Sequence, residues 1–244
     1  MEDYRAMHEY YQKNYAKLKK SMNGYLKLVS AELQQASGKD YSELLEEIWD
    51  FYDKNLLEHF PYIGGDDVSG TGNLTGAYYF VAMGEVLKNY GVSLDETGHL
   101  MVLSYERTFL RIPGFARKLA GKMFNSPKML NKMFQKKDKQ NAANAEKNPG
   151  SFETKAMIPP EEGYAFSYHN LVCPLANFAK EHGYMEYMPY LCNLDYVMFG
   201  VLGAPLYREQ TCASGGEYCD FKLKSGAPVL SYWPPVFKQG DGYQ

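Results

Sequence analysis

The sequence predicts an α+β protein, with a helical N-terminal region followed by a small, mostly antiparallel sheet that has helices on one face. The main observation is a change of period along the 244 residues. Apolar residues recur at the helical spacing through the first half of the chain, and a spacing of two appears only near residue 163. A Gly-Gly pair between two strand-like runs near the C-terminus also indicates a hairpin.

Helical patterns begin almost at the N-terminus. The first covers residues 4–36, and a break or kink is expected at Gly24. The second begins after Asp40, which has the capping-box spacing with Glu43. It should end near His59, because a proline follows and cannot continue a helix.

A glycine-rich loop is expected over residues 60–73, and it lacks the spacing of a phosphate-binding loop. Two more helices should follow. One runs over about 75–90 and ends at Gly91, and the other runs from a cap at Ser93 to about Phe109. The first half of the chain is therefore predicted to contain helices and loops alone.

Residues 117–139 are basic and rich in methionine, with lysines alternating with apolar residues. A basic amphipathic helix is typical of a segment that binds a membrane surface or a partner. An ordinary solvated helix with its apolar face packed on the protein has the same pattern. We favour the ordinary interpretation.

The polar residues 136–151 end in Pro-Gly-Ser and predict a linker. They separate a helical region, residues 1–135, from an α+β region that holds every cysteine, residues 152–244. We expect the two regions to form one continuous globule. The elements expected in the second region are a strand at 164–168, helices at 171–181 and 187–202, and strands at 205–211 and 217–223.

Composition excludes several kinds of partner. The net charge of -3 and a pI near 6.0 give no general attraction to nucleic acid. No apolar run approaches the ~18 residues of a membrane span. The charged N-terminus does not resemble a signal peptide, so we expect a cytoplasmic protein with reduced thiols. A homo-oligomer is compatible with the sequence.

The cysteines are confined to one part of the chain, at Cys173, Cys192, Cys212 and Cys219. As small, readily buried residues, one or two of them fit an ordinary core. They contain no C-x-x-C pair, and their spacings match no zinc pattern, so we expect no metal.

Two pairs of residues have spacings that suit chemistry. Cys192 and Asp195 are three apart on a predicted helix and share a face, where they can act as nucleophile and base. A purely structural Asp195 is the simpler interpretation. His169 lies four residues before Cys173, and a Cys–His pair can yield a thiolate, although this signal is weak.

Arg208 lies in a strand-like run. A guanidinium there can clamp the carboxylate of a substrate, since it donates paired hydrogen bonds in a plane. A structural ion pair with Asp195 or Asp220 is the alternative.

A set of spaced residues resembles the C-terminal signature of the L-2-amino-thiazoline-4-carboxylic acid hydrolase family. The signature consists of Tyr190-Leu-Cys-Asn-Leu-Asp195, Gly203, Arg208, Thr211, Gly215 or Gly216, and Cys219-Asp-Phe221. Similar matches upstream are Cys173-Pro174, Pro61-Tyr-Ile-Gly-Gly65 and Asn73. The resemblance thus covers about Phe60 to Leu223.

The stretch from Glu209 to Phe221 also resembles the end of the 4-vinyl-reductase domain, a ligand-binding α+β module. Cys212 favours this second family, because members of the hydrolase family are often aliphatic at that position. The resemblance therefore leaves a non-catalytic module that binds or senses a small molecule or a metal as the alternative function.

The first resemblance implies an enzyme, a hydrolase that opens a small cyclic amidine or amide carrying a carboxylate. The model reaction converts L-2-amino-thiazoline-4-carboxylate to N-carbamoyl-cysteine and requires no cofactor. The residues that match the signature or lie near it give the expected catalytic set Cys192, Asp195, Cys219 and His169, and the expected substrate-binding pair Arg208 and Thr211.

Overall fold

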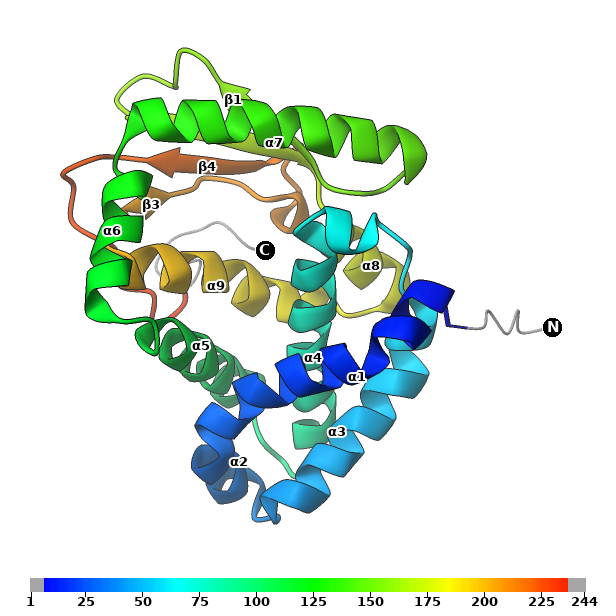
Figure 1. The fold of residues 1–244 in the computed structure, drawn as a ribbon. Coiled ribbons are helices and arrows are strands. Elements are labelled where there is room, and N and C mark those ends of the chain that lie inside the picture. The colour runs from blue at the N-terminus through cyan, green and yellow to red at the C-terminus, as the bar shows by residue number, and fades with distance from the viewer. Residues whose placement is uncertain (1–6, 237–244) are drawn as a thin grey trace. The chain divides into compact units, whose positions relative to one another are not determined.

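The computed structural model describes residues 7–236 (Figure 1). The chain divides into two compact units, unit 1 (Met1–Ser104) and unit 2 (Tyr105–Gln244). The boundary lies inside a helix, α5, and well before the predicted linker. That the whole chain forms one continuous globule stays a prediction.

Unit 1 consists of helices and loops, as predicted, although a helix begins at Gly70, inside the predicted loop at 60–73. Its elements are α1 (Glu9–Leu26), η1 (Lys27–Val29), α2 (Ser30–Ser37), α3 (Tyr41–Asn55), η2 (Leu57–His59), η3 (Gly65–Asp67), α4 (Gly70–Lys88) and the first part of α5 (Leu94–Leu110). Helix α4 is apolar around most of its circumference and is buried accordingly. The Trp49 ring of α3 packs 4.8 Å from that of Tyr79, and the Tyr52 hydroxyl donates to the Thr75 carbonyl.

Two helices of unit 1 begin at the predicted caps, whereas α3 ends at Asn55 and only the separate η2 reaches the predicted end at His59. The Asp40 carboxylate accepts from the Ser42 N–H at 2.8 Å, and the Ser93 hydroxyl accepts from the Glu96 N–H at 3.2 Å. The predicted break at Gly24 is wrong, because Gly24 lies within α1 and the turn follows at η1. Glycine weakens a helix by about 1 kcal/mol without fixing where the axis turns, whereas packing of the buried side chains around η1 does.

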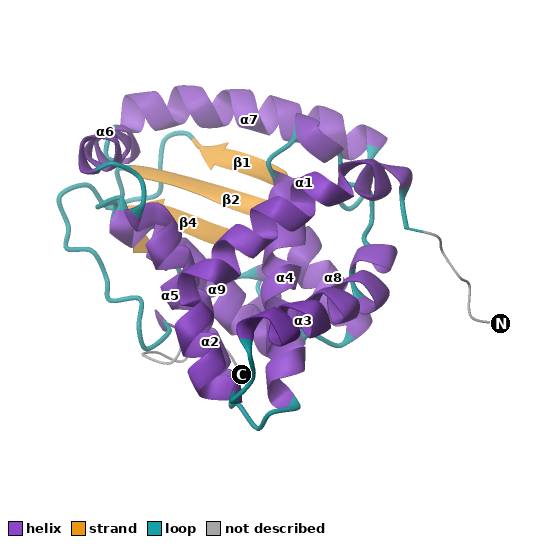
Figure 2. Ribbon diagram, turned by 60° about the horizontal axis from the view of Figure 1, so that its bottom comes forward, coloured by secondary structure: helices purple, strands orange, loops and turns teal. Residues whose placement is uncertain are grey.

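Unit 2 combines helices with a four-stranded antiparallel sheet in the order β1-β2-β4-β3 (Figure 2). Its elements after α5 are α6 (Gly114–Phe124), α7 (Pro127–Lys147), β1 (Glu153–Met157), β2 (Phe166–Val172), α8 (Pro174–His182), η4 (Met185–Tyr187), α9 (Met188–Val201), β3 (Leu206–Tyr207), η5 (Cys212–Ser214) and β4 (Cys219–Leu223). The predicted α+β class is confirmed.

Two local features differ from the sequence prediction. The polar segment 136–151 is helical as far as Lys147, because α7 continues through it. The polar strand β1 was not expected, and it pairs with the predicted strand β2. Polar contacts explain both, since the Asp138 carboxylate of α7 accepts from the Thr154 hydroxyl and the Ala156 N–H, each at 2.7 Å.

The strand register assigns side chains to the two faces of the sheet. Tyr168 pairs with Phe221, and their rings stack 4.5 Å apart on one face. Phe134 of α7 packs 4.2 Å from Tyr168, so this face carries the helices. His169 and Lys222, the next residues along the two strands, point to the other face because side chains alternate. The prediction of helices on one face is therefore confirmed.

Within the part of the chain that the structure describes, no helix is both long enough and apolar enough to cross a bilayer.

Candidate functional site

The Asp195–Arg208 pair lies at the helix-bearing face of the sheet. Arg208 follows β3, and its Nη1 atom donates to the Asp195 Oδ2 atom of α9 at 2.7 Å and to the Cys192 carbonyl at 3.3 Å. The guanidinium carbon also lies 4.3 Å from the centre of the Phe221 ring. The loop after β3 is held in turn by Asp220, whose carboxylate accepts from the Glu209 and Gln210 N–H groups.

The two members of this pair differ in exposure. The Arg208 side chain is 4% exposed, and the Asp195 side chain is 36% exposed. Desolvation raises the pKa of Asp195 above its ordinary value of 3.8, and the Arg208 charge offsets part of that rise. Asp195 is thus a carboxylate that solvent reaches, yet it holds its proton more readily than a free aspartate.

Three thiols meet beside the pair. Cys219 begins β4, Cys173 is the N-cap of α8, and Cys212 begins η5. The Cys219 sulfur interacts with both other thiols and accepts from the Cys212 N–H at 3.3 Å. Hydrogen bonds from Cys173 and Cys212, with the Arg208 charge, hold the pKa of Cys219 well below its usual range.

The same hydrogen bonds act in the opposite direction on the donors. They raise the pKa of Cys173 and of Cys212, and burial adds to this effect. Cys219 is therefore the thiol of the three that ionises first.

Lys137 of α7 was missed in the sequence because it lies in the stretch predicted to be a linker. Burial lowers its pKa, and the charges of Asp138 and Asp195 act against this. Its position follows from the helix, since Phe134 and Lys137 are three residues apart and share a face. Continuation of the helical pattern through the polar stretch is the signal that identifies it.

Two predicted site residues form contacts of other kinds. His169 points to the opposite face of the sheet, where its Nε2 atom lies 2.8 Å from the Glu161 Oε1 atom and its ring stacks on Tyr218. Thr211 is the N-cap of η5, and it forms a reciprocal capping box with Ser214. The structure thus brings Cys192, Asp195, Arg208 and Cys219 into one region and leaves His169 outside it.

Among the described residues, no group of three or more His, Cys, Asp or Glu side chains has an arrangement suited to a metal ion.

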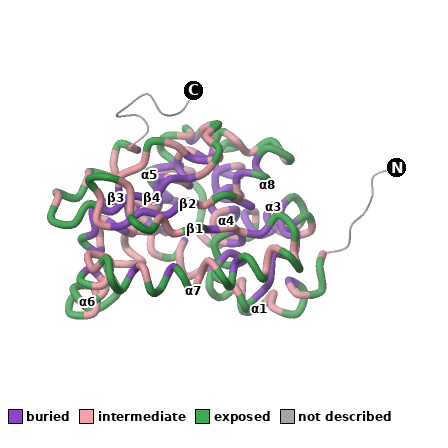
Figure 3. Tube along the Cα trace, turned by 90° about the horizontal axis from the view of Figure 1, so that it is seen from above, coloured by how far each residue is buried: buried purple, intermediate pink, exposed green. Residues whose placement is uncertain are grey.

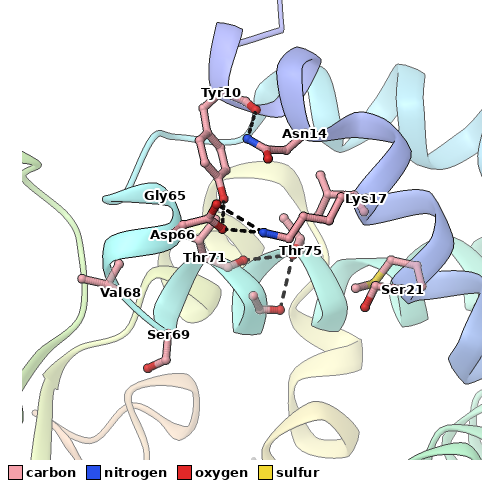
Figure 4. A pocket seen from close by; sticks show the side chains of 13 residues that line it. Tyr10, Asn14, Lys17, Ser21, Gly65, Asp66, Val68, Ser69, Thr71 and Thr75 are labelled. Atoms are coloured by element: carbon pink, nitrogen blue, oxygen red, sulfur yellow. Dashed lines mark hydrogen bonds and ion pairs between the residues drawn. The ribbon is translucent and has the colours of Figure 1, made fainter.

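Unit 1 contains a separate pocket of about 270 Å³ between α1 and the start of α4 (Figure 4). The Lys17 ammonium and the Tyr10 hydroxyl both bind the Asp66 carboxylate there, at 3.1 and 2.9 Å. Gly65 lies against the Tyr10 ring, since a Cβ added to this glycine would come within 2.8 Å of that ring. The predicted site residues all belong to unit 2, so none of them lines this pocket.

A family model matches part of the chain, and no curated protein or solved structure matches it. Residues 107–223, just under half of the chain, match the sequence model of the family described as L-2-amino-thiazoline-4-carboxylic acid hydrolase. The matched segment contains the Asp195–Arg208 pair and every cysteine, and it ends with β4. The likeness of the loop at 61–73 to the family lies outside this segment and stays a prediction. Residues 107–223 of the chain are thus similar to the L-2-amino-thiazoline-4-carboxylic acid hydrolase family.

Proposed function

We propose that the protein is a hydrolase that opens a small cyclic amidine or amide carrying a carboxylate, with L-2-amino-thiazoline-4-carboxylate as the model substrate. The observation that carries the proposal is the Asp195–Arg208 pair beside the low-pKa thiol of Cys219, inside the segment that matches the family.

The charges of the site suit such a substrate. With Asp195 deprotonated, its carboxylate and the Cys219 thiolate give the site two negative charges, and Arg208 offsets one of them. A cyclic amidine becomes an amidinium cation when it takes up a proton. Negative charges in a region of low dielectric attract that cation more strongly than the same charges do in bulk water.

Asp195 is our choice for the general base. A carboxylate whose pKa is raised is a better base near neutral pH than a free aspartate. It takes a proton from water as the water oxygen bonds to the carbon between sulfur and nitrogen. The carbon–sulfur bond then breaks as the new hydroxyl on that carbon becomes a carbonyl and releases its proton to solvent, and the proton held by Asp195 passes to the departing sulfur. The product is an N-carbamoyl amino acid with a free thiol.

Arg208 then serves as a positioning residue. It is almost fully buried, and its Nη1 atom already binds the Asp195 carboxylate, so it orients the base. The substrate carboxylate needs another cation, and we assign this role to Lys137, whose charge interacts with that of Asp195. Cys192 is on the same helix as Asp195 and contributes a wall of the site.

The test is an assay of the purified chain against the model substrate and a panel of carboxylated cyclic amidines, imides and thiazolines. Release of a new thiol and the mass of the carbamoyl product report ring opening. Asp195→Asn should melt normally and lose turnover, while Asp66→Asn, which changes an exposed carboxylate of unit 1, should keep it. Turnover of Asp195→Asn at the wild-type rate would remove Asp195 from the mechanism.

One observation favours a second function, a module that binds or senses a small molecule. The proposed hydrolysis uses neither Cys173 nor Cys212, although both contact Cys219. A wild-type chain that opens no ring in the panel, but whose melting temperature rises with a ligand, would support this second function over the enzyme.

A further inference from the structure

Helix α6 exposes large apolar side chains. Phe115 is 77% exposed and Leu119 is 68% exposed, and Ile112, just before the helix, is also exposed. The opposite side of α6 packs on the protein, with Phe124 5.3 Å from Phe199 of α9. Figure 3 draws α6 and α7 with long stretches in the colours of exposed and intermediate residues. The outward side of α6 is therefore apolar without being buried.

Positive charge is concentrated on the same part of the chain. Residues 107–139 carry ten Lys or Arg and a single acidic residue, a net charge of +9, whereas the whole chain carries -3. The rest of the chain must therefore carry -12. The acidic residue is Asp138, and its carboxylate binds Thr154 and Ala156 of β1. Both of its oxygen atoms are therefore engaged in the protein.

Apolar and basic residues share the outward face of α6. Phe115, Lys118, Leu119 and Lys122 follow the i, i+3, i+4, i+7 spacing of one helix face, and all four are exposed. Helix α7 buries Leu130 and Phe134, as a packed helix does, and its exposed apolar residues are the two methionines Met129 and Met133. We call Ile112, Phe115, Leu119 and the two lysines the α6 surface.

We propose that the α6 surface docks onto a membrane that contains anionic lipids. Phe and Leu side chains of an interfacial helix enter the boundary between headgroups and acyl chains, and flanking lysines remain with the lipid phosphates. Each basic residue near an anionic surface strengthens binding about fivefold. The helix has 11 residues, so it lies along the surface. A nucleic acid would use the charge but not the apolar side chains.

Co-sedimentation with vesicles tests this proposal. The wild-type chain should bind vesicles of phosphatidylcholine with phosphatidylglycerol, bind weakly to phosphatidylcholine alone, and release as salt rises. Phe115→Ser/Leu119→Ser should lose at least tenfold in affinity. Lys118→Gln/Lys122→Gln should lose on the order of twentyfold. The matched control, Lys13→Gln/Lys20→Gln, removes two exposed charges of α1 and should bind like wild type.

A second readout reports insertion directly. The added tryptophan of Phe115→Trp should show blue-shifted emission with anionic vesicles, after subtraction of the wild-type signal. Failure of the folded wild-type chain to bind either vesicle would overturn the proposal. Self-association that Phe115→Ser/Leu119→Ser abolishes, without vesicle binding, would assign the α6 surface to a second copy of the chain. Equal binding to both vesicles, insensitive to salt, would contradict the role of the lysines.

Discussion

The Arg208 guanidinium lies 2.7 Å from the Asp195 carboxylate, and the arginine is nearly buried while the aspartate remains one-third exposed. The cation is thus fixed in the protein and the anion is offered to solvent. A buried arginine beside a partly exposed aspartate suits a carboxylate that must exchange a proton with a small molecule. The pKa of Asp195 therefore depends on Arg208, a residue that a ligand does not need to contact.

The pH dependence of turnover should report this coupling. As a base, Asp195 is active only when deprotonated, so the rate should fall as pH falls through its raised pKa. Arg208 lowers that pKa, and Arg208→Gln should therefore move the acidic limb of the profile to higher pH. Arg208→Lys keeps the charge and should move it less. NMR titration of the Asp195 carboxyl gives its pKa directly in both proteins. If the acidic limb of the pH–rate profile and this titration are unchanged in Arg208→Gln, the two groups are not coupled.

Stability should respond to the same arginine. Arg208→Ala removes a charge-assisted hydrogen bond of a nearly buried side chain and should lower the free energy of unfolding by roughly 1.5–3 kcal/mol. Lys17→Met breaks an ion pair whose partners are both largely exposed, and should cost about 0–1 kcal/mol. Denaturant melts of the two variants give the comparison, and equal losses would count against the importance of burial.

The thiol cluster gives a direct spectroscopic prediction. Because Cys219 has a lowered pKa and its neighbours have raised ones, one thiolate should absorb in the ultraviolet at neutral pH. Cys219→Ser should remove that absorbance. Cys192→Ser, the control on α9, should retain it. Retention of the full signal in Cys219→Ser would assign the negative charge to a different thiol.

The sequence predicted the parts of the fold that depend on local chemistry. The Asp40 and Ser93 caps are local features, and each was found where its side chain requires it. The C-terminal strands β3 and β4 do pair antiparallel, but β3 is only Leu206–Tyr207 and the connection contains η5 in place of a tight glycine turn. Strand β1 and the end of α7 were missed, because they are stabilised by contacts between Asp138 and Thr154 that composition does not reveal.

The residues of the candidate site also fall into two groups, those that the sequence predicted and those that only the tertiary fold reveals. Cys192 and Asp195 lie on one helix, and their shared region followed from spacing. Arg208 came from the family motif, and Lys137 comes from a helix far from that motif in sequence, so its position depended on the tertiary fold. His169 was expected at the site because of its proximity to Cys173 in sequence, but strand alternation turns its side chain to the other face.

Substrate binding should depend on Lys137 and not on its neighbour. Lys137→Gln should raise KM for carboxylated substrates with a smaller effect on kcat, because the lysine contacts a group that does not change during the reaction. Lys136→Gln, an exposed residue of the same helix, should have wild-type KM. If an amide analogue that lacks the carboxylate shows the same loss with Lys137→Gln, the lysine does not recognise the carboxylate.

Two glycines that both lie in helices should respond oppositely to a methyl group. A Cβ at Gly121 of α6 would meet the backbone carbonyl oxygen of Leu202, which cannot move as a flexible side chain would. Gly121→Ala should therefore cost about 1–3 kcal/mol and loosen α6 from the end of α9. A Cβ at Gly24 of α1 has no neighbour within 4 Å, so Gly24→Ala should stabilise the chain by about 0.4–1 kcal/mol, through helix propensity and the entropy of the unfolded state. Thermal and denaturant melts measure both changes.

The Gly121→Ala result also bears on the α6 surface, since a loosened α6 should expose Phe124 as well and raise binding of a hydrophobic dye. A Gly121→Ala chain as stable as Gly24→Ala would mean that α6 does not pack as closely on Leu202 as the structure has it.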